Sequence, residues 1–250
     1  MRTITIRGVE LGAGVPKTIV PIVAKTKADI LAKAEEITKL PADLVEWRAD
    51  FYEDLFNVER LLDTLKALRG VLKDTPILFT IRTKPEGGEV KLLYEQYSEI
   101  NLEVAKSGDA DLVDIEMFWG NKDWNTEVFD VSAKLVDKIH KAGCLVVGSR
   151  HNFADTPDRD SIALTLKHQQ EAGADVLDVI DASIEYGRDS DRPFLTISMG
   201  PLGMLSRVAC EFCGSCMTFG AAGQASAPGQ IQVGELKDML AKIHNAQAGA

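Results

Sequence analysis

The sequence predicts an α/β fold, a parallel sheet covered by helices, which at 250 residues closes most naturally as a (β/α)8 TIM-type barrel. Two observations predict it. Short apolar runs that fit buried parallel strands alternate with helical patterns at intervals of roughly 25–35 residues. Charged and polar residues directly follow several of these runs, where parallel α/β proteins place their active sites. No linker or low-complexity segment interrupts the alternation, so we expect a single domain over residues 1–250.

The first half of the chain begins with a hairpin pattern and then alternates strands with helices. Weak alternation over residues 3–13 runs into Gly12 and Gly14, which predicts a short hairpin. Buried strands are expected at Thr18–Ala24, Leu44–Arg48, Ile77–Arg82 and Leu112–Phe118. Pro21 is awkward in the first of these because it has no N–H for a sheet ladder. Apolar residues at helical spacing predict helices at Asp29–Thr38, Val58–Val71 and Leu92–Ser107.

The second half continues the alternation. Helices are predicted at Val131–Ala142, Ser161–Ala172 and Val233–Ala246, the first two stopped by Gly143 and Gly173. Strands are predicted at Leu145–Ser149, Phe194–Met199 and Met217–Ala221. Gly200-Pro-Leu-Gly203 and Ala227-Pro-Gly-Gln230 follow the last two strands as turns that let the backbone approach a small ligand.

Composition describes an ordinary soluble globular protein, with 45% hydrophobic and 26% charged residues. The formal net charge of -10 argues against nucleic acid or an anionic membrane as a partner, but it leaves room for a small anionic substrate held by local arginines. The first residues lack the apolar core of a signal peptide, and no run approaches the length of a membrane span. We therefore expect a cytoplasmic protein.

Three of the four cysteines, Cys210, Cys213 and Cys216, form a C-x2-C-x2-C run that resembles part of an iron–sulfur motif. The fourth cysteine and the proline of that motif are missing, and Cys144 lies far away in sequence. Small, softly apolar residues that pack between a helix and a strand explain the run better. We expect no metal, no cofactor and, in a reducing compartment, no disulfide.

Polar residues gather at the carboxyl ends of the predicted strands, which in a barrel form one mouth. They are Glu46, Arg48, Arg82, Glu86, Asp114, Glu116, His151, Arg207, Ser226 and Gln230. Three arginines on one face suit recognition of a carboxylate or phosphate. His151 suits a general acid and base, and Glu86 could orient it and stabilise its charged form. The sequence thus predicts an enzyme that acts on a small polar anion with proton transfer at its centre.

The motifs that carry these residues resemble those of type I 3-dehydroquinate dehydratases. They are Val-Glu46-Trp-Arg48-Ala-Asp, Ile-Arg82-Thr-Lys-Pro-Glu86-Gly-Gly, Ser-Arg-His151-Asn-Phe, Ser-Met-Gly, Leu-Ser-Arg207 and Ala-Ser226-Ala-Pro-Gly-Gln230. The resemblance implies a (β/α)8 barrel, usually a homodimer, that removes water from 3-dehydroquinate by syn elimination in the shikimate pathway.

The resemblance also implies roles for the residues of the mouth. His151 would be the general base and acid, with Glu86 as its partner. The substrate's carboxylate and hydroxyls would be held by Glu46, Arg48, Arg82, Arg207, Ser226 and Gln230, with Arg207 as the carboxylate clamp. Met199 would lie against the ring.

One feature of the family is absent from this sequence. Members form a Schiff base through a lysine on the sixth strand, shortly after a Gly-Ala-Asp. Here Gly173-Ala174-Asp175 leads into Val176-Leu-Asp-Val-Ile180, and no lysine lies between Lys167 and Lys237. In one alignment Val176–Ile180 is strand six and Asp178 replaces the lysine. In the other, strand six is missing and Val176–Gly187 belongs to the helix that normally follows it.

We favour the second alignment, because the family's helix also ends in a similar Asp-Arg-Pro. Strand six is thus expected to be shortened, replaced or missing around residues 175–187, and a missing strand would leave the barrel open. Three hypotheses follow: a 3-dehydroquinate dehydratase, a non-catalytic binder of quinate- or shikimate-like carboxylates, and a lysine-independent lyase that uses His151. Lys84 and Lys25 fall near strand ends and are candidate substitute amines.

Overall fold

Eight parallel strands form a barrel in the computed structural model, which describes residues 3–119, 130–151, 159–180, 192–197, 200–212 and 214–248. The strands are β3 (Lys17–Ile22), β4 (Leu44–Arg48), β5 (Ile77–Thr80), β6 (Leu112–Glu116), β7 (Leu145–His151), β8 (Val176–Ile180), β9 (Phe194–Thr196) and β10 (Met217–Phe219). They pair in the order β10-β3-β4-β5-β6-β7-β8-β9. The ring closes just before β10, where Cys216 N donates to Phe194 O at 2.8 Å and Cys216 O accepts from Lys17 N at 2.9 Å. The predicted barrel is confirmed.

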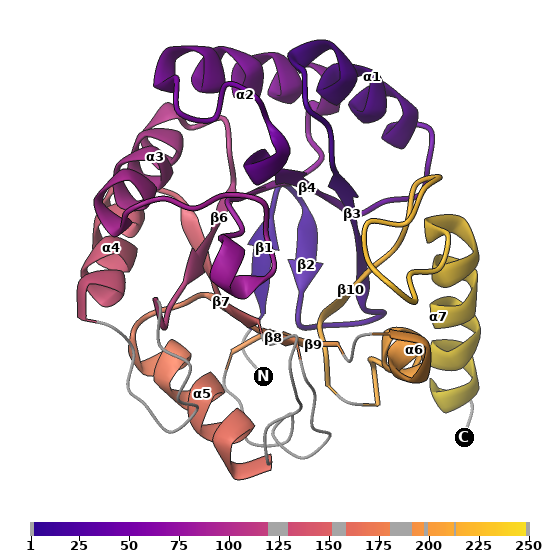
Figure 1. Ribbon diagram of the computed structural model, residues 1–250. Coiled ribbons are helices and arrows are strands. Elements are labelled where there is room, and N and C mark those ends of the chain that lie inside the picture. The colour runs from indigo at the N-terminus through magenta and orange to yellow at the C-terminus, as the bar shows by residue number, and fades with distance from the viewer. Residues whose placement is uncertain are drawn as a thin grey trace.

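Helices surround the strands on the outside of the barrel (Figure 1). They are α1 (Lys27–Ile37), α2 (Val58–Leu72), α3 (Tyr94–Ser107), α4 (Asp130–Lys141), α5 (Arg159–Glu171), α6 (Gly200–Val208) and α7 (Val233–Ala248). Two 3-10 turns, η1 (Ala49–Phe51) and η2 (Lys84–Glu86), follow β4 and β5. None of the helices among the described residues is long and apolar enough to cross a membrane.

The strands bury both faces, and the two faces differ. Outward residues such as Val45, Trp47 and Phe79 pack with the helices in the largest apolar cluster. Inward residues near the amino ends, such as Leu44 and Leu112, form a second cluster inside the barrel. Further along the same strands the inward positions become polar, so the barrel has an apolar floor and a polar mouth.

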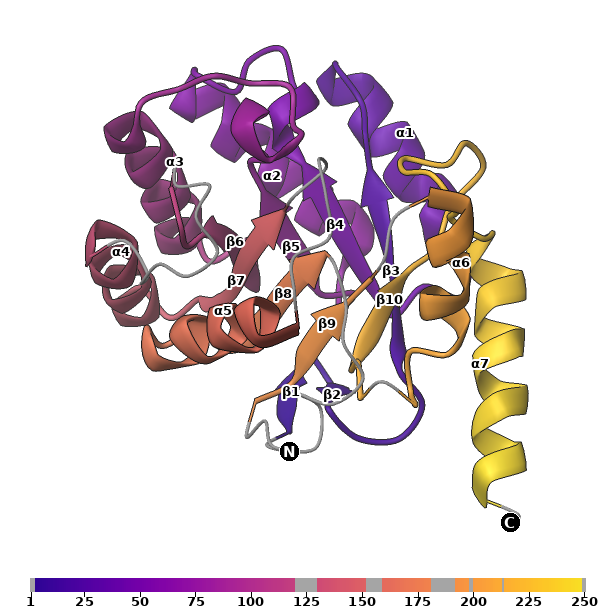
Figure 2. The same cartoon turned by 60° about the horizontal axis from the view of Figure 1, so that its bottom comes forward.

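A hairpin closes the amino end of the barrel. Strands β1 (Ile4–Ile6) and β2 (Val9–Leu11) pair antiparallel, as the sequence predicts. Ile6 and Leu11 are buried in the cluster inside the barrel. Figure 2 shows the hairpin below the barrel strands, at the end away from their arrowheads. This end is therefore plugged, and the opposite end remains for a ligand.

Strand six is present, so the favoured alignment is wrong for Val176–Ile180. These residues pair in parallel with β7 on one side and β9 on the other. Val176 is buried in the cluster inside the barrel, and Leu177 is buried with Ile162 and Leu166 of α5 outside it. A run that is apolar on both faces fills the place between two strands better than the surface of a helix. The remainder of the predicted helix, residues 181–187, lies outside the described residues.

What is short is the connection after β8. Residues 181–193 make the shortest link between consecutive strands of the barrel, close to the minimum for a parallel crossover. The barrel is therefore complete in strands, and the expectation of a missing strand that leaves the barrel open is wrong.

The predicted turn at Gly200-Pro-Leu-Gly203 is also wrong, because these residues begin helix α6. Proline is well tolerated in the first turn of a helix, where its missing N–H would have no helical partner. Strand β9 ends at Thr196, earlier than predicted, and Met199 lies outside the described residues.

Candidate active site

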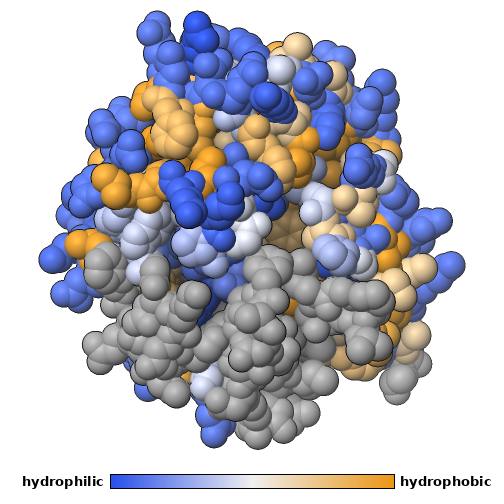
Figure 3. Space-filling view, viewed as in Figure 1, coloured by the Kyte–Doolittle hydropathy of each residue, from blue (hydrophilic) through white to orange (hydrophobic). Residues whose placement is uncertain are grey.

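The carboxyl ends of the strands surround a cavity of about 250 Å³. Leu78, Val147, Leu195 and Met217 line its apolar part. Charged and polar residues line the rest; they are Glu46, Arg48, Arg82, Glu86, Glu89, Asp114, His151, Arg207, Ser226 and Gln230. Figure 3 shows this face of the molecule, with a central hollow that has hydrophilic side chains on part of its rim. A small polar molecule with an apolar ring matches such a lining.

Strand alternation places the polar side chains. Glu46 and Arg48 are two residues apart on β4, as are Asp114 and Glu116 on β6 and Ser149 and His151 on β7. Residues two apart point to the same side of a strand. The residues between them, such as Trp47 and Ile115, point outward into the apolar cluster. Because the strands lie in parallel around the barrel, their inward-pointing charged residues form a ring at the mouth.

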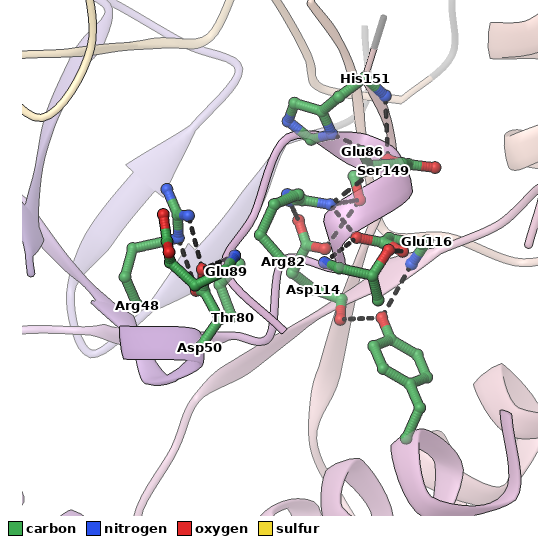
Figure 4. Close-up of polar contacts among 12 residues, drawn as sticks. Arg48, Asp50, Thr80, Arg82, Glu86, Glu89, Asp114, Glu116, Ser149 and His151 are labelled. Atoms are coloured by element: carbon green, nitrogen blue, oxygen red, sulfur yellow. Dashed lines mark hydrogen bonds and ion pairs between the residues drawn. The ribbon is translucent and has the colours of Figure 1, made fainter. Parts of the chain in front are cut away.

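His151 and Glu86 form a pair at this mouth (Figure 4). Glu86 Oε2 lies 3.0 Å from His151 Nδ1 and accepts the His151 backbone N–H at 2.9 Å. Arg82 Nη1 lies 3.5 Å from the same oxygen. Because the backbone N–H and the guanidinium both need a lone pair on Oε2, we assign the proton of the imidazole to Nδ1. Nε2 is then the acceptor that a substrate would meet.

Burial and charge set the protonation of this pair. Burial, together with the positive charges of Arg82 and Arg48, holds the pKa of His151 well below 6.5. Burial and repulsion by Glu116 raise the pKa of Glu86 well above 4.5. The His151 imidazole is consequently neutral near pH 7, the state that can accept a proton.

Arg82 is the centre of a buried network below the pair. Its Nη2 donates to Asp114 Oδ2 at 2.8 Å, and its Nη1 donates to Glu116 Oε1 at 3.1 Å and to Ser149 Oγ at 2.9 Å. Its side chain is 6% exposed. Two carboxylates hold this guanidinium in place, so Arg82 supplies charge to the cavity from a fixed position.

Arg48 is held in a different way. Its Nε and Nη2 donate to the two oxygens of Asp50, both at 2.8 Å, in the bidentate geometry that fixes a guanidinium plane. Glu46, beside it on the strand, accepts from Thr80 Oγ1 at 2.8 Å, and burial raises its pKa.

A loop after β10 completes the mouth. Gln230 Oε1 accepts from Ser226 N at 2.8 Å and from Ser226 Oγ at 3.1 Å, which folds the loop onto itself. Arg207 Nη2, on α6, donates to the carbonyl of Pro228 in this loop at 3.2 Å. The Arg207 side chain is buried, and burial lowers its pKa.

The structure brings eight of the nine predicted site residues to one cavity. His151, Glu86, Glu46, Arg48, Arg82, Arg207, Ser226 and Gln230 all line it. The ninth, Met199, lies outside the described residues. Their roles toward a substrate stay predictions.

Sequence reasoning missed the residues that hold these side chains. Asp114 and Glu116 stand in the strand-end pattern, but their bonds to Arg82 depend on the fold. Asp50 and Ser149 gave no signal of their own, and Ser149 ends an apolar run. Ser149 could have been predicted from strand alternation, because it lies two residues before His151 and therefore points to the same side of the strand.

No lysine lines the cavity among the described residues. The side chains of Lys84 and Lys25 are exposed and do not line it. Lys122 is the one lysine of the sequence that falls outside the described ranges. The prediction that Lys84 or Lys25 substitutes for the missing amine therefore has no support from the geometry.

The cysteines lie away from this chemistry. Cys144, Cys210 and Cys216 are buried, and Cys213 lies outside the described residues. Within the described part of the chain, no three His, Cys, Asp or Glu side chains gather as a metal site would require. Cys216 contributes through its backbone, which closes the barrel.

Comparison with known proteins identifies close relatives. The family model for type I 3-dehydroquinase matches residues 18–247. The 3-dehydroquinate dehydratase of Bacillus licheniformis is 41% identical, over 97% of this chain and 98% of that protein. The one from Listeria welshimeri is 40% identical, over 98% and 99%. Both alignments span 257 positions, more than this chain has residues, so both relatives contain residues that this chain lacks.

Solved structures agree. The type I 3-dehydroquinate dehydratase of Clostridium difficile, described with covalent modified comenic acid, matches with a TM-score of 0.88 and 35% identity, over 98% of this chain and 99% of that one. The 3-dehydroquinate dehydratase of Geobacillus kaustophilus matches with a TM-score of 0.88 and 30% identity, over 98% and 97%.

Proposed function

The chain belongs to the type I 3-dehydroquinase family of carbon–oxygen lyases, and from this premise we propose that it binds 3-dehydroquinate in the cavity and dehydrates it to 3-dehydroshikimate. The observation that carries the proposal is the contact between His151 and Glu86 at the mouth, with Nδ1 and Oε2 3.0 Å apart. A neutral imidazole fixed by a carboxylate is what a proton transfer at neutral pH requires.

The reaction removes a proton from the carbon beside the ketone and hydroxide from the next carbon. We assign the first transfer to His151 Nε2, which accepts the proton while the electrons of the C–H bond move toward the ketone carbon. As the ketone re-forms, this electron pair makes the double bond between the two reacting carbons and the C–O bond breaks. The same imidazolium gives its proton to the departing hydroxide, so that water leaves and the histidine is neutral again. Glu86 keeps Nδ1 protonated and the ring oriented throughout.

Substrate recognition falls to the arginines. Arg207 is the proposed carboxylate clamp, because its buried guanidinium lines the cavity and can bind a carboxylate with two parallel hydrogen bonds. Arg48, fixed by Asp50, and the Ser226–Gln230 loop are proposed to hold the hydroxyls. Arg82 is already occupied by Asp114 and Glu116, so we propose that it acts on the substrate mainly through its charge.

The missing lysine changes the energetics. An iminium would withdraw electrons from the reacting carbon more strongly than a ketone does. We therefore propose that dehydration here proceeds through the ketone, far more slowly than with an amine nucleophile. The absence of a lysine among the described lining residues also favours a second candidate, a binder of quinate- or shikimate-like carboxylates that does not turn them over.

The test combines intact mass, turnover and trapping on one preparation. The purified protein is weighed, assayed with 3-dehydroquinate, and weighed again after 3-dehydroquinate with borohydride, which reduces only a Schiff base to a stable adduct. We expect the mass of this sequence, slow turnover that His151→Ala abolishes, and no adduct.

Each other result contradicts part of the proposal. An adduct at the expected mass would mean that an amine such as that of Lys122 reaches the substrate, and peptide mapping would identify it. Saturable binding without turnover would favour the second candidate. If the protein neither binds 3-dehydroquinate nor turns it over, both candidate functions are wrong.

We further propose that the protein is a homodimer of the cytoplasm. Exposed apolar side chains gather on α6 and the neighbouring α7 and in the segment between them, namely Met204, Leu205, Phe212 and Met239. Apolar side chains on adjacent elements often mark an interface. The buried thiol of Cys144 suits a reducing compartment. Light scattering at micromolar protein should give twice the monomer mass, and the monomer mass would contradict the dimer.

A further inference from the structure

We propose that Glu116 is a positioning residue that, through Thr83, holds loop 83–90 so that Glu86 meets His151. The inference deepens the proposed function, on which it rests for its catalytic meaning. It concerns a residue that does not line the cavity, and it depends on the buried contacts between β6 and the loop after β5.

Glu116 binds three donors with its two oxygens. Oε1 accepts from Arg82 Nη1 at 3.1 Å (Figure 4) and from Thr83 N at 2.8 Å, and Oε2 accepts from Thr83 Oγ1 at 2.6 Å. The side chain is 2% exposed. Hydrogen bonds to a buried carboxylate are stronger than those between neutral groups, so this anchor is firm.

Thr83 links Glu116 to Glu86 through its backbone carbonyl. The Thr83 carbonyl accepts from Glu86 N at 3.0 Å and from Gly88 N at 2.8 Å, so the last residue of η2 and the loop just after it fold back onto the residue that Glu116 holds. Lys84 N donates to Val90 O at 2.7 Å and closes the base of the loop. All backbone polar groups of Thr83 are thereby used, and the loop has little freedom to move Glu86.

The loop also lies directly on Arg82. A Cβ at Gly88 would come within 1.9 Å of the Arg82 carbonyl oxygen, so only glycine allows this approach. At its far end Glu89 N donates to Asp50 Oδ2 at 3.3 Å, beside Arg48. The loop therefore sits between two fixed arginines, and its position is set by Glu116 on one side and Asp50 on the other.

Strand β6 is itself held at Glu116. Tyr97 Oη, from α3, donates to Asp114 O at 3.1 Å and accepts from Glu116 N at 3.0 Å. These bonds fix the backbone that carries Glu116. The charged groups around the His151–Glu86 pair are Arg48 on β4, Arg82 just after β5, and Asp114 and Glu116 on β6.

The experiment removes one bond of the anchor and keeps its shape. Thr83→Val keeps the branched side chain and the backbone N–H but loses the hydroxyl, whereas Thr83→Ser restores it. The readout is nuclear magnetic resonance of histidine-labelled full-length protein, in which His151 is assigned by its absence from His151→Gln. The measured signals are the downfield Nδ1–H resonance of His151 and the pH midpoint of its ring.

In the wild type we expect the Nδ1–H resonance to be visible and the midpoint to lie below 6.5. In Thr83→Val the resonance should disappear, and the midpoint should rise by roughly half a pH unit or more, because a loosened loop admits water to the pair. Thr83→Ser should behave as the wild type. Glu116→Asp, which keeps the charge but is too short to reach all three donors, should behave as Thr83→Val.

Wild-type signals in both Thr83→Val and Glu116→Asp, with an intact circular dichroism spectrum, would overturn the inference. So would a failure of Thr83→Ser to restore the signals in a folded protein. If Glu116→Asp does not fold, the two Thr83 variants still decide. The resonance experiment uses no substrate, so it remains valid even if the turnover assay fails. If the pH titration of His151 is the same in the variants as in the wild type, the positioning role of Glu116 fails but the proposed function does not.

Discussion

Individual charges in this site are mostly neutralised before any ligand arrives. Arg82 lies against Asp114 and Glu116, and Arg48 lies against Asp50. Arg207 Nη2 donates to the carbonyl of Pro228 in the loop after β10, and burial lowers its pKa. A buried guanidinium that lines the cavity can bind a carboxylate with two parallel hydrogen bonds, so Arg207 stays the proposed carboxylate clamp.

Arg207→Ala should weaken binding of 3-dehydroquinate by about 2–5 kcal/mol, the cost of removing one partner of a buried charged pair. Isothermal titration of wild type and variant measures the change in Kd. The control is Arg60→Ala, which removes an exposed arginine on α2 whose side chain is 66% exposed. If Arg207→Ala binds as tightly as Arg60→Ala, the carboxylate clamp is assigned to the wrong residue.

His151 should also make stability depend on pH. Its pKa is lower in the folded protein than the 6.5 of an unfolded chain, so below pH 6.5 the unfolded state binds the proton first and the fold loses stability. The loss approaches about 1.4 kcal/mol per pH unit until the folded pKa is reached. Glu86 works the other way, because its raised pKa makes stability fall as pH rises through that value.

The comparison of wild type with His151→Gln in urea, at several pH values from 7 to 5, isolates the histidine. We expect the free energy of unfolding of the wild type to fall relative to the variant as pH decreases. Parallel curves over that range would show that the pKa of His151 is not depressed.

At the scale of elements, one arrangement recurs at the amino ends of alternate strands. Asp43, Asp111 and Asp175 directly precede β4, β6 and β8. Each accepts the backbone N–H of the preceding strand, from Thr18, Ile77 and Val146 in turn, at 2.8–2.9 Å. Each also binds a basic side chain of a neighbouring helix, namely Lys237, Arg69 and His140. Three carboxylates thus fasten strand to strand and sheet to helix at the end opposite the cavity.

Asp111→Ala should therefore cost about 2–3 kcal/mol of unfolding free energy, because it leaves the Ile77 N–H without its acceptor and the half-buried Arg69 without its carboxylate partner. Chemical denaturation measures the loss. Asp63→Ala is the matched control; its carboxylate is 70% exposed and binds only the surface Lys27 within the described contacts, so we expect less than about 1 kcal/mol. Equal losses in the two variants would mean that the strand-end carboxylates are ordinary surface charges.

For the whole molecule, the barrel could be predicted from the sequence because most strands are short apolar runs and the helices have apolar residues at helical spacing. It also predicted the ring of polar residues, since parallel strands bring their carboxyl ends together. It did not place strand six, because five residues that are apolar on both faces fit a short helix as well as a strand until β7 and β9 are seen on either side. It did not find Glu116 or Asp50 as anchors, because a charged residue near a strand end has several possible partners. Only the fold selects Thr83 for Glu116 and Arg48 for Asp50.

The closed ring has a consequence for unfolding. The cavity is lined from β4, β5, β6, β7, α6 and the loop after β10, so a ligand bound there touches segments from most of the chain. If residues 1–250 form one domain, as we propose, binding must stabilise the entire barrel at once. At a ligand concentration 100 times Kd the gain is about 2.7 kcal/mol, which for a chain of this size raises Tm by roughly 5–10 °C.

We expect differential scanning calorimetry to show one transition that moves upward as a whole with 3-dehydroquinate, and a much smaller shift for Arg207→Ala at the same concentration. Two transitions of which only one moves would show that part of the chain folds separately from the cavity. Because the shift needs binding and not turnover, it also separates the two candidate functions. The transition temperature rises with 3-dehydroquinate for a dehydratase and for a binder without turnover. Only for the dehydratase does this rise become smaller as the substrate is consumed.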